Sequence, residues 1–291
     1  MNGEEIINPG AVPESPSFKD YRFEFVAGAE PLPEEYSLRD KIFWIKNQRS
    51  SSCVAQSFSY YAELLNLLET GEKIKLSARD IYSVICLPQG GAYLRSGAQK
   101  VKDSGVVLEE DAPSYLAGRI PLAELEMRKR DDITEEEIKR GKTFLARSYV
   151  RIPEKSFESL KRAIYEYHGA VTGIIGDTKS WFWDVGKDGI VDLPKKREFG
   201  HAIFCVGWKK INGKEYIEFV NSFGPDWGDN GFGYLPKEYF DKNLVFNPWT
   251  LIDMPNEYYP TVLKTVGVLK RLIVAIRVLL EKLTKRSLIK T

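Results

Sequence analysis

Helical and strand-like patterns occupy different halves of this 291-residue chain, and this segregation is the feature that most restricts its fold. Between residues 54 and 68, apolar side chains recur every three or four positions, which predicts a long, largely buried helix. Beyond Gly169 the pattern changes to short apolar runs separated by Gly and Asp, which predicts strands at 170–175, 201–207, 216–221 and 232–235. Helices followed by strands favour an α+β protein with two packed halves over an alternating parallel sheet.

Three parts follow from this pattern. Residues 1–31, rich in Pro, Gly, Glu and Ser, predict an extended lead-in with one short strand around residues 21–26. Residues 32–256 form the main domain, with a helical half at about 45–145 and a β-rich half at about 146–256. Residues 257–291 predict a basic amphipathic helix.

The helical half contains further helical signals besides the one that starts near Cys53. Shorter helices are expected there at 77–81 and 94–104, and another at 156–167 in the β-rich half, with Ser or Gly at their ends. The segment 121–147 is dominated by Glu, Lys and Arg at helical spacing, so it predicts a solvated helical excursion.

Composition excludes several classes of protein. The chain is 43% hydrophobic and has six Trp, 15 Tyr and 15 Phe, which is more core material than a disordered chain contains. Three Cys without a CxxC motif predict neither a disulfide framework nor a cysteine zinc site. The acidic start at Met1–Gly10 is unlike a signal peptide, and Arg277 interrupts the most apolar stretch, so we expect a soluble cytoplasmic protein.

The net charge of +1 conceals a basic tail. Residues 261–291 hold eight Lys and Arg against one Glu, a net charge of +7, which leaves −6 for residues 1–260. Apolar residues in this tail follow a heptad-like spacing: Val262, Val266, Leu269, Ile273, Ile276, Leu280 and Leu283. Three interpretations compete: packing on its own domain or self-association, docking to a partner protein, and contact with an anionic membrane surface. Nucleic-acid binding is not expected, because the apolar face would then have no role.

Cys53 lies where a nucleophile could be activated. It follows a small-residue turn and occupies the first turn of the long helix, where unpaired N–H groups stabilise a thiolate. A working thiol also needs a base, and the chain has only two histidines, His168 and His201. His168 precedes Gly169 at a helix-to-strand corner and is expected to be a capping or surface residue. His201, in contrast, opens an apolar strand.

Four motifs in this order resemble the papain-like cysteine peptidases: Gln48…Ser52-Cys53, Gly90-Gly91, Gly200-His201-Ala202 and Asn221-Ser222-Phe223-Gly224-x-x-Trp227-Gly228. The similarity runs from about Leu32 to about Pro248. It implies a two-lobed fold, with a helical lobe that carries Cys53 and a β-barrel-like antiparallel lobe that carries His201 and Asn221. No metal or organic cofactor is implied.

The resemblance also implies roles for these residues. Cys53 would be the nucleophile, His201 the general acid and base that forms an ion pair with it, and Asn221 the residue that orients the imidazole. Gln48 would donate a side-chain N–H to the oxyanion hole together with the backbone N–H of Cys53. Gly90 and Gly91 would bind an extended polypeptide substrate.

Phe223 and Trp227 would then be the supporting aromatic residues beside Asn221. The expected function is therefore that of a cysteine endopeptidase that works through an acyl-enzyme. Two alternatives stay open: a catalytically impaired peptide-binding module and a transpeptidase or ligase.

The chain also departs from the family pattern. The loop between Gln48 and Cys53 is one residue shorter than usual, so the binding-module alternative assumes that Gln48 is displaced. Val54 and Phe223 replace two usual tryptophans, and the usual Cys of the nucleophile loop is absent. Residues 1–31 are shorter than the helical inhibitory propeptide of secreted members, so we expect any zymogen control to use another device.

Other polar or reactive residues have structural interpretations. Cys205 alternates with apolar neighbours on a strand and Cys86 lies in an apolar stretch, so both are expected to be structural thiols. Three aspartates between the predicted strands are expected to form turns: Asp177, Asp184 and Asp188.

Overall fold

The computed structural model describes residues 9–17, 20, 23, 27–28 and 30–252 of the chain. The possible strand at 21–26 and the basic helix at 257–291 fall mainly or wholly outside the described residues, so these two predictions are not addressed. Among the described residues, no helix combines the length and the apolar character that a membrane span requires.

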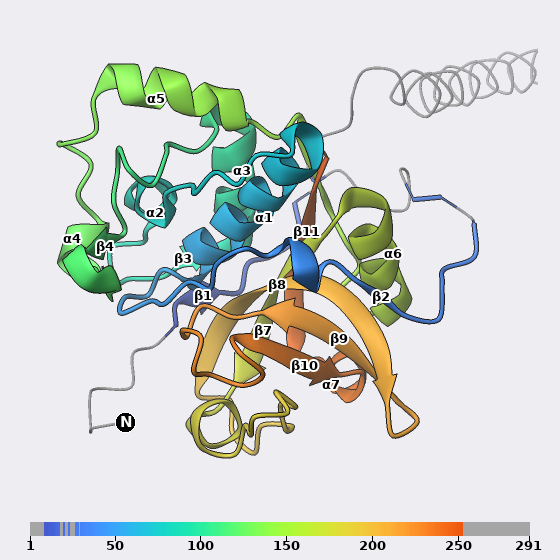
Figure 1. Cartoon of the computed structure of the whole chain (residues 1–291). Coiled ribbons are helices and arrows are strands. Elements are labelled where there is room, and N and C mark those ends of the chain that lie inside the picture. Colours follow the sequence, from blue (N-terminus) through green and yellow to red (C-terminus); the bar gives the residue numbers. More distant parts are fainter. Residues whose placement is uncertain (1–8, 18–19, 21–22, 24–26, 29, 253–291) are drawn as a thin grey trace, which may run out of the picture. The chain divides into compact units, whose positions relative to one another are not determined.

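Figure 1 shows the helices α1, α2, α3 and α5 gathered in one half of the domain and the large sheet in the other. The helices are α1 (Cys53–Thr70), α2 (Ala78–Ile85), α3 (Leu94–Ser104), α4 (Glu124–Met127), α5 (Glu135–Gly141), α6 (Phe157–Tyr167) and α7 (Glu238–Asp241). Shorter helical turns are η2 (Arg39–Lys41), η3 (Ala117–Arg119), η4 (Lys142–Phe144) and η5 (Lys179–Trp183). The strands are β1 (Ala11–Val12), β2 (Tyr36–Ser37), β3 (Ala92–Tyr93), β4 (Tyr115–Leu116), β5 (Ile120–Pro121), β6 (Ser148–Arg151), β7 (Ala170–Gly176), β8 (Phe199–Ile211), β9 (Lys214–Val220), β10 (Phe232–Pro236) and β11 (Val245–Ile252).

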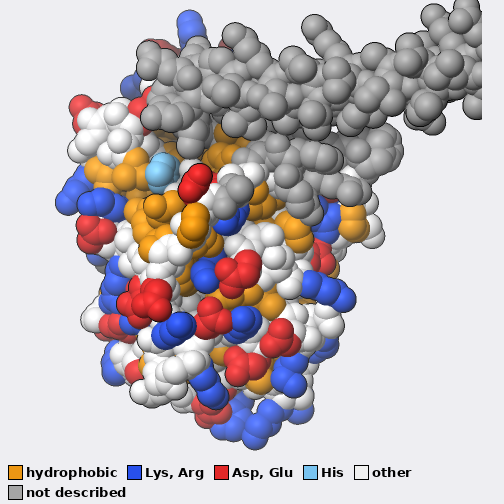
Figure 2. All heavy atoms as spheres, turned by 90° about the vertical axis from the view of Figure 1, so that its right-hand side faces the viewer, with side chains coloured by type: hydrophobic (Ala, Val, Ile, Leu, Met, Phe, Trp, Pro, Cys, Tyr) orange, Lys and Arg blue, Asp and Glu red, His pale blue; other side chains and the backbone are white. Residues whose placement is uncertain are grey.

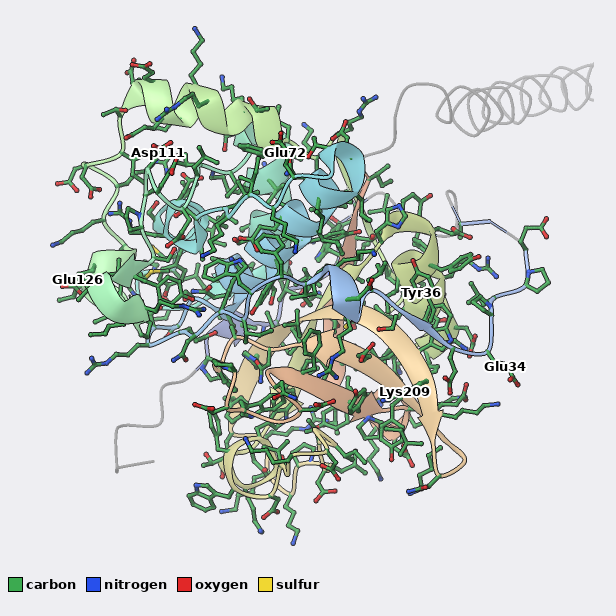
Figure 3. All side chains as sticks on the ribbon, viewed as in Figure 1. Glu34, Tyr36, Glu72, Asp111, Glu126 and Lys209 are labelled. Carbon is green, nitrogen blue, oxygen red and sulfur yellow. The ribbon has the colours of Figure 1, made fainter. Side chains whose placement is uncertain are left out.

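The large sheet is antiparallel and open. Its strands follow the order β10-β9-β8-β7-β11-β6, and β2 adds to the far part of β8. The expected two-lobed fold is therefore present, and its β-rich half is an open sheet that does not close into a barrel. Figure 3 shows Tyr36 and Glu34 beside this sheet, where the indole N–H of Trp208 donates to the carbonyl oxygen of Glu34 at 3.1 Å.

Helix α1 joins the two halves. Its apolar face is buried, and its last turn ends at Gly71, which has a φ of +78° and donates its N–H to the carbonyl oxygen of Leu67. Tyr61 of α1 packs on Phe204 of β8 with ring centroids 4.9 Å apart, and Ser57 Oγ donates to the carbonyl oxygen of Ala202 at 3.1 Å. The helix that begins at Cys53 is thereby fixed against the strand that carries His201.

The segment 121–147 differs from the predicted solvated helix. It contains two short helices, α4 and α5, and it buries Met127 and Ile133. Its charged side chains bind other parts of the chain: Glu124 accepts the backbone N–H of Ser51 at 2.8 Å. The expectation of a solvated helix therefore holds for α5, where Glu135, Glu136 and Lys139 are exposed, but not for Glu124, whose partner is distant in sequence.

The surface in Figure 2 carries Lys and Arg side chains interspersed with Asp and Glu over the face shown.

Candidate active site

Cys53 is the first residue of α1, at the point where the helix meets β8. Its side chain is fully buried, and its Sγ accepts the backbone N–H of Ala202 at 3.3 Å. The N-terminal end of α1 directs unpaired backbone N–H groups toward this position, which favours a negatively charged sulfur.

His201 and Asn221 come together because they belong to neighbouring antiparallel strands. His201 lies near the start of β8, and Asn221 follows the end of β9. The His201 ring Nε2 and the Asn221 Oδ1 are 2.8 Å apart. The other ring nitrogen, Nδ1, is buried and has no hydrogen-bond partner among the described residues. Asn221 thus binds one ring nitrogen of His201, and the other ring nitrogen is not engaged by any described residue.

Aromatic rings hold the imidazole in place. Phe223 stacks on the His201 ring with centroids 4.6 Å apart, and Phe182 stacks on the other side of Phe223 at 4.8 Å. Trp181 meets the His201 ring edge-on at 5.5 Å, and Trp227 stacks on Trp181 at 6.0 Å. Phe223 therefore contacts the histidine directly, whereas Trp227 packs behind it against both Trp181 and Phe223.

Trp181 and Phe182 were not identified from the sequence. The signal was the run Trp181-Phe182-Trp183, which is exceptionally aromatic for a loop between two strands. These residues form the helical turn η5, and the pairing of Trp181 with His201 depends on tertiary packing that the sequence pattern does not encode.

Gln48 lies beside the nucleophile in spite of the shortened loop. Its Nε2 donates to the carbonyl oxygen of Pro9 at 3.3 Å, and the backbone N–H of Cys53 donates to the same oxygen at 3.2 Å. Ser222 Oγ donates to the Gln48 Oε1 at 2.6 Å, and Nε2 also donates to the carbonyl oxygen of Ser50 at 2.7 Å, so both ends of the amide are held. The structure brings together the two donors that were expected to form an oxyanion hole, and a carbonyl oxygen of the chain itself lies between them.

Pro9 belongs to an N-terminal strap, which we define as residues 9–17. Strand β1 of the strap pairs in parallel with β3, and the backbone N–H of Ala92 donates to the carbonyl oxygen of Gly10 at 2.8 Å. A Cβ added at Gly91 would overlap Gly10, and one added at Gly200 would overlap Ala11. The strap therefore passes between the Gly91 wall of the helical half and the start of β8 in the β-rich half, as Figure 1 shows for β1.

Burial of the site changes the ionisation of the two reactive side chains. Burial raises the pKa of the Cys53 thiol to about 12, and it lowers the pKa of His201 to about 4. Since both shifts disfavour the charged form, a neutral thiol and a neutral imidazole predominate at neutral pH. The expected ion pair is thus disfavoured as long as the strap excludes water from the site.

A hydrogen-bond network supports the loop before Cys53. Glu124 of α4 accepts from the backbone N–H of Ser51 at 2.8 Å and from the hydroxyl of Tyr82 at 2.6 Å. The Tyr82 hydroxyl in turn accepts the backbone N–H of Gly91 at 3.1 Å, and Arg128 donates to Glu124 at 2.8 Å. Glu124 therefore connects the nucleophile loop to the Gly91 wall of the groove.

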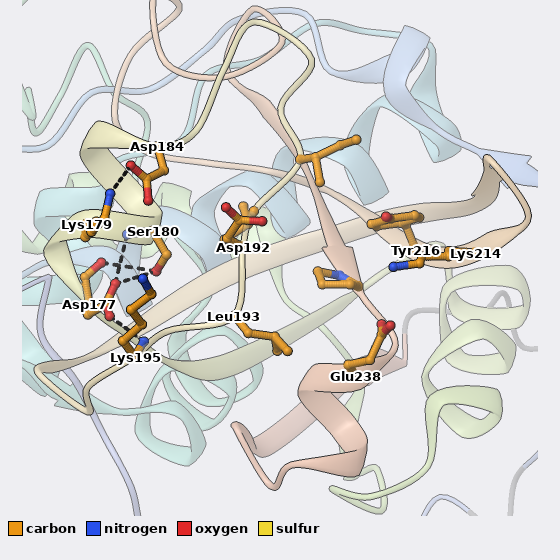
Figure 4. Close-up of a pocket in the computed structure, with 13 residues that line it drawn as sticks. Asp177, Lys179, Ser180, Asp184, Asp192, Leu193, Lys195, Lys214, Tyr216 and Glu238 are labelled. Atoms are coloured by element: carbon orange, nitrogen blue, oxygen red, sulfur yellow. Dashed lines mark hydrogen bonds and ion pairs between the residues drawn. The ribbon is translucent and has the colours of Figure 1, made fainter.

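A separate cavity of about 430 Å³ lies in the β-rich half (Figure 4). Its lining mixes acidic and basic side chains, among them Asp177, Asp192, Lys195 and Glu238, and it includes none of the residues at Cys53. Asp177 already accepts the backbone N–H groups of Ser180 and Lys195, which is the turn-forming role expected for it. In the described part of the chain, no three His, Cys, Asp or Glu side chains lie close enough to hold a metal ion.

Comparison with known proteins identifies similar chains. The sequence model described as papain family cysteine protease matches residues 32–243. Mexicain from Jacaratia mexicana is 27% identical over 69% of this chain and 86% of its own length. The oryzain beta chain from Oryza sativa subsp. japonica is 27% identical over 70% of this chain, which spans 42% of that relative.

Solved structures share the fold. Xylellain, a cysteine protease from Xylella fastidiosa, superposes with a TM-score of 0.68 at 19% identity, over 84% of this chain and 96% of its own. The Carica candamarcensis cysteine protease CMS1MS2, solved in complex with E-64, has a TM-score of 0.58 at 18% identity over 77% of this chain and all of its own.

Proposed function

The chain belongs to the papain family of cysteine proteases and is a thiol-dependent peptide hydrolase, and on this premise we propose that Cys53, His201 and Asn221 perform the reaction. The convergence of Gln48 Nε2 and the Cys53 N–H on one carbonyl oxygen carries the proposal, since a substrate carbonyl in that place would lie against the nucleophile.

The chemical steps use each residue in turn. His201 Nδ1 accepts the thiol proton, and the Cys53 sulfur attacks the substrate carbonyl carbon to give a tetrahedral oxyanion between Gln48 and the Cys53 N–H. Collapse expels the amine, which takes the proton from His201, and leaves a thioester. A water molecule, deprotonated by His201, then attacks the thioester and releases the acid and the thiol.

We further propose that the strap keeps the enzyme closed. Pro9 supplies the oxygen that both oxyanion donors bind, and β1 uses the backbone of Ala92 that an extended substrate would need. The closed form and the open form would then be in equilibrium, and only the open form would admit a polypeptide.

Hydrolysis of a fluorogenic peptide library under reducing conditions tests the assignment, with Cys53→Ala as the control. E-64 provides a second measurement, because a mass adduct on Cys53 reports the open, reactive site. Equal hydrolysis by wild type and Cys53→Ala would contradict the assignment.

Two predictions from the sequence alone also remain proposals. Residues 261–291 are proposed to mediate self-association or contact with a partner protein or an anionic membrane surface, and the chain is proposed to act in the cytoplasm. Vesicle co-sedimentation and light scattering of the full chain, with Lys270→Glu and Arg271→Glu introduced together, separate these three modes of contact. Fractionation of cells that express the chain tests its location.

A further inference from the structure

Past β1, side chains from both halves of the molecule bind the strap at Glu14. From the β-rich half, the Asn247 Oδ1 accepts the backbone N–H of Glu14 at 2.8 Å, and the Asn247 Nδ2 donates to the carbonyl oxygen of Glu14 at 2.8 Å. Both contacts involve only the backbone of Glu14. The same amide could therefore bind any extended peptide that lies in this position.

From the helical half, Arg95 binds the carboxylate of Glu14. The backbone N–H of Arg95 donates to Oε1 at 2.9 Å, and its guanidinium lies 3.1 Å from Oε2. The Glu14 side chain is only 8% exposed, so this is an enclosed carboxylate site. Arg95 follows β3 by two residues, which places the site on the wall that starts at Gly91 and Ala92.

Arg95 depends on the strap region for its acceptors. Its guanidinium also donates to the carbonyl oxygen of Ser15 at 3.1 Å and to Asp20 at 2.9 Å. Among the described residues, all hydrogen-bond acceptors of Arg95 belong to positions 14–20. Arg151 also lies near Asp20, at 3.6 Å, but it has a second partner outside residues 14–20, Glu154 at 2.5 Å.

Opening of the strap would remove Glu14 and Ser15 from Arg95, and displacement of Asp20 with it would leave the guanidinium without its partners at the end of the substrate groove. A partly enclosed cation of this kind favours a ligand that restores a charge-assisted, two-point contact. An acidic side chain does so, whereas its amide analogue offers one neutral acceptor and no charge.

We propose that Arg95 and Asn247 form a substrate subsite that selects an acidic side chain, and that Glu14 occupies this subsite in the closed form. The inference rests on the proposed function, since the subsite continues the groove that begins at Cys53. Asn247 holds the peptide backbone and Arg95 determines which side chain is preferred.

Competition between two peptides tests the proposal. A positional peptide library is first cleaved by the full-length wild-type enzyme. The cleaved sequences identify the position, on either side of the cleaved bond, at which Glu is enriched. Two peptides that differ only by Glu or Gln at that position then compete in one reaction. The ratio of their kcat/KM values does not depend on how much enzyme is open, because both peptides use the same open fraction.

The wild-type enzyme is expected to prefer the Glu peptide by about tenfold, the usual value of one charge-assisted contact. Arg95→Gln is expected to bring the ratio close to one while it raises the absolute rate on the Gln peptide, because the strap loses its contacts with the guanidinium. Lys102→Gln, which removes a cation from the same helix, is expected to leave the ratio unchanged. Arg95→Glu is expected to shift the preference to a Lys peptide.

A ratio that stays near tenfold in an active Arg95→Gln enzyme would overturn the inference and leave the proposed function intact. If the wild-type enzyme cleaves peptides of the library but shows no enrichment of Glu at any position, the inference is likewise overturned and the proposed function stands. Failure of wild type and all variants to cleave any peptide, with no E-64 adduct on Cys53, would overturn the proposed function together with the inference.

Discussion

Replacement of Gly10 by valine tests whether the strap controls access to Cys53. Gly10 has a φ of +100°, and an added Cβ would overlap the carbonyl oxygen of Ser51. Gly10→Val therefore introduces an unfavourable backbone conformation and a collision in the closed form, whereas the open form tolerates the side chain.

The size of the effect follows from these two costs. A β-branched residue held in such a conformation costs about 1–3 kcal/mol, before any collision is counted. Each 1.4 kcal/mol changes the ratio of open to closed enzyme about tenfold. While the closed form predominates, the rates of E-64 labelling and of peptide hydrolysis scale with the open fraction. Both rates are thus expected to rise about 10- to 100-fold.

Gly213→Val is the matched control. Gly213 also has a positive φ, of +79°, but a Cβ there meets no atom within 4 Å, and the residue lies in the turn between β8 and β9. This variant carries the backbone cost without displacing the strap. Mass mapping distinguishes the Cys53 adduct from one on Cys86. If Gly10→Val folds normally and labels no faster than Gly213→Val, the strap does not limit access.

Three further predictions concern ionisation, loop positioning and the core. Because burial raises the pKa of Cys53 to about 12 and lowers that of His201 to about 4, the closed wild type should hold little thiolate between pH 6 and 9, whereas Gly10→Val, which favours the open form, should hold more; the ultraviolet absorbance of the thiolate measures the difference. Glu124 holds the loop before Cys53 through the backbone N–H of Ser51, so Glu124→Gln should lower kcat several-fold with little change in KM in steady-state assays. Glu126→Gln, on the same helix, should change neither constant. The buried ammonium of Lys46 lies 2.8 Å from the buried carboxylate of Glu63. Lys46→Met removes this cation from the carboxylate and should lower the free energy of unfolding by about 3–5 kcal/mol in urea titrations.

The helices near the site were predictable because their signals are local. Apolar spacing and a terminal Gly located α1 to within two residues at either end, and a Ser cap located α6. Strand β11 was not predicted, because Asn247 and Pro248 interrupt its apolar pattern. In the sheet, the pairing of β11 with β7 is irregular at the same place, between Phe246 and Trp249. The interruption places Asn247, with its φ of +44°, against the strap.

The position of Gln48 shows what a sequence pattern cannot supply. Counting residues along the loop raised the alternative that Gln48 is displaced, since one residue fewer separates it from Cys53. Ser222, which follows Asn221, donates to the amide oxygen of Gln48 across 174 positions in sequence, while the amide nitrogen donates to the carbonyl oxygen of Ser50 within the loop. The contact with Ser222 is the one that a count of loop residues does not reveal. A Ser222→Ala variant is therefore expected to weaken oxyanion binding although the loop keeps its length.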